Sequence, residues 1–134
     1  MPRSGNPGFS EDVVQFVTTS LRTVWALELL MLLRGAPDQV WTPAGLTAEL
    51  RANLSMVDEM LRRLEGLGLA GREGAGREGE GWRYRPAQAD LDDLCARTEQ
   101  AYRQKPFAMI SLIYRNAGPL QDLADAFRLK GKTP

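Results

Sequence analysis

The stretch Thr42–Leu69 constrains the fold of this chain most, because it reads as two short helices joined by a tight turn. Thr42 and Pro43 form a helix start: a threonine side chain can accept from free N–H groups of the first turn, and proline at the first helical position needs no donor. We predict the first helix over residues 43–51. We predict that Ser55 caps the second helix and that two glycines end it.

The second helix has one apolar side, and a strand and a hairpin are expected around the pair of helices. The apolar positions fall at helical spacing and are Val57, Met60, Leu61, Leu64 and Leu67. A short strand is predicted at residues 39–41. Trp82 and Tyr84 alternate with arginines, which is the period of a strand with one covered face, and the Gly- and Glu-rich residues 74–81 indicate an open hairpin loop. We expect both aromatic rings to cover the core rather than to stack on bases.

This order of a short strand, two short helices and a hairpin resembles the winged helix-turn-helix of bacterial transcriptional regulators, over residues 20–86. Its helices at both ends resemble the layout of MarR and PadR regulators. The resemblance implies a mainly α fold, with a three-helix core, a short β-hairpin wing and additional C-terminal helices. It also implies that the second helix enters the major groove while the wing contacts the backbone or minor groove. The DNA-binding candidates in this sequence are Ser55, Arg62, Arg63, Arg72, Arg77 and Arg83.

The segments outside the helix-turn-helix carry more apolar surface than a winged helix needs. We predict a disordered leader at residues 1–9, a winged-helix domain with an N-terminal helix at 10–88, and a C-terminal helical extension at 89–130. The N-terminal helix is either one long helix or two, with Ser20 as a second N-cap. An apolar helix needs cover, so we expect a homodimer. The candidate interface residues are Val14, Val17, Phe107, Ile110, Tyr114 and Phe127.

The extension is predicted to contain three helices, beginning at Asp90, at Pro106 and at Leu120.

Two polar side chains in predicted helices need a separate account. Glu28 lies in an apolar run, so it is expected to pair with an arginine, with a ligand-sensing role as the alternative. Cys95 is expected to be a small core residue rather than a nucleophile or a sensor.

The composition restricts the function. The 134 residues include 17 Lys and Arg, 17 Asp and Glu, one cysteine and no histidine. A chain without histidine lacks the commonest general base and metal ligand, so we expect no enzyme, no metal site and no cofactor. One cysteine excludes an internal disulfide. The most apolar run is about half the length needed to span a bilayer, and we expect a cytoplasmic protein without a membrane partner.

The zero net charge leaves the function open between two classes. The first is a sequence-specific duplex DNA-binding transcriptional regulator, acting as a homodimer. The second is a winged-helix module that binds a protein, because Asp58 and Glu59 would repel DNA unless Arg62 and Arg63 pair with them at i+4. A weaker alternative is an amphipathic tail on anionic lipid, against which the acidic residues of that tail argue.

Overall fold

The structure is a computed structural model that describes residues 8–73 and 81–116. It shows a mainly helical protein with one two-stranded antiparallel hairpin. The elements are α1 (Glu11–Gln15), the π-helical η1 (Phe16–Leu21), α2 (Val24–Gly35), α3 (Pro43–Leu50), α4 (Leu54–Gly66), β1 (Ala70–Glu73), β2 (Gly81–Tyr84), α5 (Ala89–Gln104) and a further helix described over residues 106–116.

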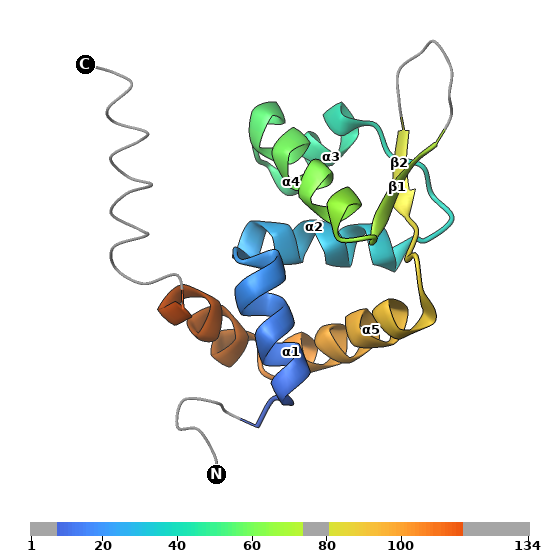
Figure 1. Cartoon of the computed structure of the whole chain (residues 1–134). Coiled ribbons are helices and arrows are strands. Elements are labelled where there is room, and N and C mark those ends of the chain that lie inside the picture. The colour runs from blue at the N-terminus through green and yellow to red at the C-terminus, as the bar shows by residue number, and fades with distance from the viewer. Residues whose placement is uncertain (1–7, 74–80, 117–134) are drawn as a thin grey trace, which may run out of the picture.

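The elements form two groups on opposite sides of α2 (Figure 1). The helices α3 and α4 and the hairpin lie on one side, and α1, α5 and the helix 106–116 lie on the other. The first group with α2 is a three-helix core with a β-hairpin wing, so the predicted fold class is confirmed. The predicted third helix of the extension, together with Phe127, lies outside the described residues, as does Arg77.

The first helix of the helix-turn-helix begins as the sequence predicts. The Thr42 hydroxyl accepts from the backbone N–H of Gly45 at 2.9 Å, and Pro43 occupies the first turn. The strand predicted at residues 39–41 is reduced to one bridge, in which Trp41 and Trp82 exchange two backbone hydrogen bonds. The reason is a turn before it, in which the Gln39 N–H donates to the Ala36 carbonyl and is therefore not available to a sheet.

The N-terminal helix is divided, but not at the predicted residue. Ser20 remains inside η1, so its prediction as a second N-cap is wrong. The break falls at Arg22, which has a left-handed backbone, and the Thr23 hydroxyl caps α2 by accepting from the Ala26 N–H at 3.1 Å. The Thr18 hydroxyl donates to the Val14 carbonyl, which satisfies this polar group inside the helix. The axis turns through 108° between η1 and α2.

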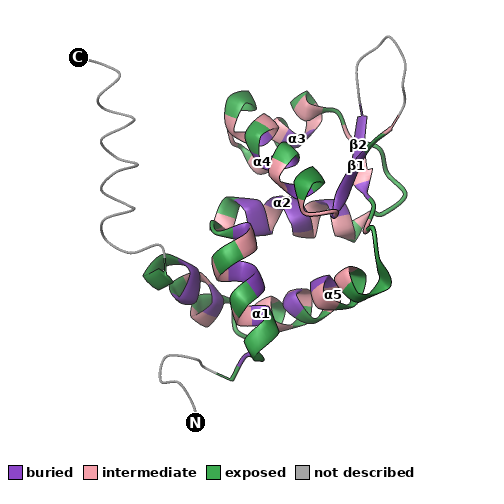
Figure 2. Ribbon diagram, in the orientation of Figure 1, coloured by how far each residue is buried: buried purple, intermediate pink, exposed green. Residues whose placement is uncertain are grey.

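The buried apolar side chains form one hydrophobic core, whose members come from residues between Phe9 and Ile113. Every labelled element contributes buried side chains to it (Figure 2). Trp82 and Tyr84 are buried, which confirms that they cover the core. Phe9 was assigned to the leader by the sequence, but its ring is buried at the edge of this core. Among the described residues no single helix could span a membrane; only the bent pair of the α1–η1 arm and α2 reaches the required length and composition.

Among the described residues, Glu28 is held by a tyrosine instead of the predicted arginine. The Tyr102 hydroxyl of α5 donates a hydrogen bond to the Glu28 carboxylate of α2. Burial, with this hydrogen bond, raises the pKa of Tyr102 to about 12. A neutral phenol satisfies the carboxylate without bringing a second charge into a partly buried site.

Arg34, at the end of α2, connects the hairpin to α5. Its Nε donates to Glu99 at 3.0 Å, and its Nη1 donates to Asp92 at 3.0 Å and to the Tyr84 hydroxyl at 3.2 Å. The Tyr84 hydroxyl in turn donates to Asp92 at 2.6 Å. Burial and this bond to a carboxylate raise the pKa of Tyr84. The base of the wing is therefore fixed to α5 by a network of charge-assisted hydrogen bonds.

Cys95 provides a test of this packing. The thiol is fully buried on α5, as the sequence predicts, and burial raises its pKa to about 11. A thiol in an unfolded chain ionises near pH 8.5. Stability from this group is thus complete below about pH 8.5 and decreases as the pH rises towards 11. At pH 8 we expect a disulfide reagent to label Cys95 only after denaturant is added; rapid labelling of the native protein would contradict the buried placement.

Candidate nucleic-acid interface

The helix α4 is the element that a winged helix would place in the major groove. The Asn53 side chain caps it by accepting from the Met56 N–H at 2.8 Å, so the prediction of Ser55 as the cap is wrong. Asparagine is as good a cap as serine, and Asn53 precedes Ser55 by two residues. As a result Ser55 lies within the first turn of α4 and is exposed.

The outward face of α4 is mainly polar, with one exposed apolar side chain, Leu54, in its first turn, and it is covered by no described element. Its opposite face packs into the core, with Val57, Met60, Leu61 and Leu64 buried as predicted. Arg62 points outward and its Nη2 lies 3.2 Å from Asp58, with the two side chains 65% and 46% exposed. Such an exposed pair contributes little stability and can exchange partners. Glu59 has no ion pair within the described part of the chain.

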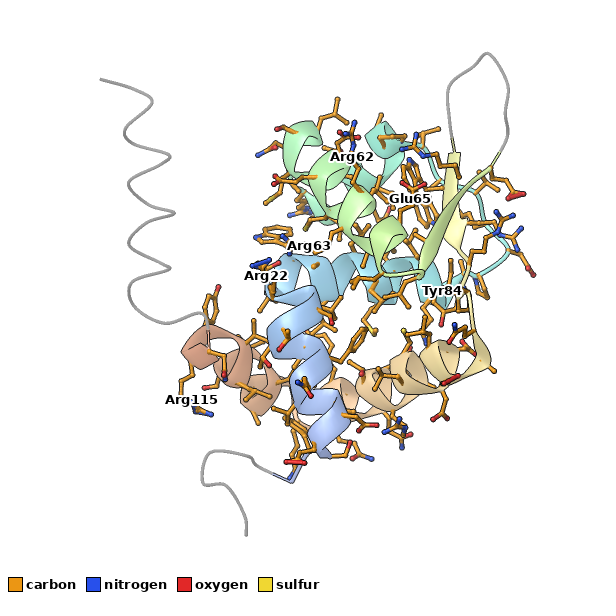
Figure 3. The ribbon with its side chains drawn as sticks, viewed as in Figure 1. Arg22, Arg62, Arg63, Glu65, Tyr84 and Arg115 are labelled. Atoms are coloured by element: carbon orange, nitrogen blue, oxygen red, sulfur yellow. The ribbon has the colours of Figure 1, made fainter. Side chains whose placement is uncertain are left out.

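Arg63 faces a different direction from Arg62. Its Nη1 donates to the Leu21 carbonyl at the end of η1, at 2.9 Å. Figure 3 shows Arg63 extending towards the start of α2, beside Arg22, whereas Arg62 lies on the far side of α4. Arg63 therefore connects α4 to the N-terminal arm, which the sequence could not indicate because the two groups lie 42 residues apart.

The described arginines of the wing are already paired with carboxylates. Arg72 lies 3.2 Å from Glu65 of α4, and its guanidinium also stacks over the Trp82 ring at 4.6 Å. Arg83 and Arg85 share Glu73, each at 3.4 Å. These three guanidiniums thus share two carboxylates, so most of their positive charge is neutralised.

Arg22 and Arg51 are two exposed arginines outside the predicted DNA-binding set. Both have a positive φ, of 70° and 58°. Neither has a side-chain hydrogen bond or ion pair to any residue that the structure describes. Nothing in the sequence marked them, because left-handed positions at helix ends are usually identified by glycine.

The predicted dimer residues differ in exposure. Phe107 and Tyr114 are 84% and 58% exposed, and Ile110 is partly buried beside them on the same helix. Val14 is partly buried, and Val17 is fully buried within the chain itself. Val17 therefore contributes to the core of one chain and not to its surface.

Comparison with known proteins gives similarity of fold. No family model matches the chain, and no curated protein matches its sequence. The crystal structure of RV1404 from Mycobacterium tuberculosis is 16% identical, with 90% of this chain and 80% of that chain covered, at a TM-score of 0.53. Apo MarR from E. coli is 18% identical (92% and 90% covered, TM-score 0.49), and a possible transcriptional regulator from Methanosarcina mazei Go1 is 15% identical (75% and 85% covered, TM-score 0.49). At these identities the likeness extends to the fold alone.

Proposed function

We propose that this protein is a duplex DNA-binding transcriptional regulator that acts as a homodimer. One observation carries the proposal: the outward face of α4 is mainly polar and exposed, and no described element covers it beside the wing. In a winged helix this face enters the major groove, with Ser55 and Arg62 near base edges and phosphates. Arg72 and Arg83 contribute through the wing if a phosphate replaces their carboxylate partners.

The proposed homodimer rests on the helix 106–116. Phe107, Ile110 and Tyr114 are spaced i, i+3 and i+7 and therefore share one face of it. The opposite face already packs into the core through Met109 and Ile113. A helix with one face in its own core and exposed aromatic rings on the other is a suitable element for a two-fold contact between identical chains.

A second candidate function is a module that binds another protein. The observation in its favour is the charge of α4, in which Asp58 neutralises Arg62 and Glu59 has no ion pair in the described part of the chain. A protein partner with basic residues would complement this face better than a phosphate backbone does. The two candidates differ in salt dependence, because only DNA binding releases condensed counterions.

The test is a fluorescence titration of the full chain with random-sequence duplex DNA at several salt concentrations. We expect affinity to decrease steeply with salt, and Arg62→Ala to reduce the slope of log K against log salt by about one. Arg103→Ala is the matched control, because this α5 side chain is 76% exposed and also pairs with a carboxylate. Its slope should equal that of the wild type. An intact dimer that binds no duplex at low salt would favour the protein-binding module instead.

A further inference from the structure

Helix ends in this chain use two different residues for the same backbone geometry. The left-handed conformation occurs at Arg22 after η1, at Arg51 after α3 and at Gly68 just beyond α4, with φ of 70°, 58° and 79°. Glycine adopts this region without strain, whereas a Cβ makes it unfavourable. At Gly68 a Cβ would lie 3.2 Å from the Ala87 side chain, so packing favours glycine there. At the other two ends the chain carries an arginine.

Packing within the chain does not account for these two arginines. Both are exposed, and neither side chain has a hydrogen bond or ion pair within residues 8–73 and 81–116. Other described arginines pair with carboxylates, namely Arg34, Arg62, Arg72, Arg83, Arg85, Arg97 and Arg103. A strained backbone position that carries an unpaired cation is a reason to look for a ligand.

The two arginines lie near opposite ends of α4. Arg51 stands just before the Asn53 cap. Arg22 follows Leu21, whose carbonyl accepts from Arg63 in the C-terminal half of α4 (Figure 3). Arg63 lies nine positions after Leu54, the first residue of α4, which corresponds to about 14 Å along the helix axis. The major groove is about 12 Å wide, and its phosphates line both rims. The spacing therefore suits one phosphate contact on each rim.

We propose that Arg22 and Arg51 bind phosphates of the two DNA strands that flank the groove entered by α4. This rests on the proposed function and adds to it the backbone contacts that orient the helix. A guanidinium is suited to the role, since it can donate two parallel hydrogen bonds to one phosphate. The contacts carry no base preference, so they set affinity and register for every sequence alike. They also supply positive charge beside an α4 face that is itself partly neutralised.

Glycine substitutions separate binding from folding at these positions. Glycine suits the left-handed backbone, so Arg22→Gly and Arg51→Gly should keep or raise the thermal midpoint. In the titration with random-sequence duplex, each should reduce the slope of log K against log salt by about 0.9, and the double variant by about twice that. Arg22→Lys and Arg51→Lys retain the charge and should retain the slope. Arg103→Ala is the control for loss of an exposed arginine elsewhere.

The competing account is structural, because a cation at a helix C-terminus also interacts favourably with the helix dipole. On that account the glycine variants lower the thermal midpoint and leave the salt slope unchanged, which would overturn the inference. If the wild type binds duplex and Arg62→Ala reduces the slope while the glycine variants do not, the inference about phosphate contacts is wrong and the proposed function stands. If the wild type binds no duplex even at low salt, both the proposed function and the inference that rests on it are wrong.

Discussion

Replacing Phe107 with aspartate is expected to convert the proposed homodimer into monomers and to lower its affinity for duplex DNA by about 100-fold or more. The ring is 84% exposed and shares a helix face with Tyr114. A carboxylate at that position would have to lose its hydration in the contact between two chains, which is costly. A monomer engages one half-site instead of two, and loses the gain that comes from linked binding.

Light scattering at micromolar concentration measures the first effect, and the duplex titration measures the second. Phe107→Leu is the matched control, because it keeps an apolar side chain at the same exposed position and should stay dimeric. Far-UV circular dichroism should be the same for all three proteins, since Phe107 lies outside the core. A monomeric wild type would rule out the homodimer, and a dimeric Phe107→Asp variant would place the contact on another face.

The helix-turn-helix and the hairpin could be predicted because their signals are local. Thr42 followed by Pro43 is a start that needs no tertiary contact, and alternating Trp82 and Tyr84 define a strand with one covered face. Local signals were insufficient where two of them competed. Asn53 and Ser55 are both good caps within three residues, and the structure uses Asn53.

The partners of the charged side chains could not be predicted from sequence, because most of them join segments that are distant in the chain. Three pairs do follow from i+4 spacing: Asp58–Arg62, Asp93–Arg97 and Glu99–Arg103. Arg63 finds a carbonyl at Leu21, and Glu28 finds a phenol instead of the expected arginine. Each choice depends on how η1 and α5 pack against α2 and α4. The sequence therefore predicted the helix α4 and its buried face, but not the contact that Arg63 makes with Leu21.

Trp82→Ala is expected to lower the free energy of unfolding by about 3–5 kcal/mol, a large part of the about 5–15 kcal/mol typical of a domain. The ring is 2% exposed in the core beneath the guanidinium of Arg72. Its loss leaves a cavity at the base of the wing and removes the surface on which Arg72 stacks. The midpoint of urea unfolding, followed by circular dichroism, measures the effect.

The controls separate a core residue from a base-stacking one. Trp82→Phe keeps an aromatic ring in the cavity and should restore most of the stability. Trp25→Ala makes the same change at a ring that is 40% exposed, so its cost should be smaller. If Trp82 served mainly to stack on bases, Trp82→Ala would keep its unfolding midpoint and lose affinity for DNA. Because the backbone N–H and C=O of Trp82 both pair with Trp41, and its ring is enclosed, we expect the loss of stability.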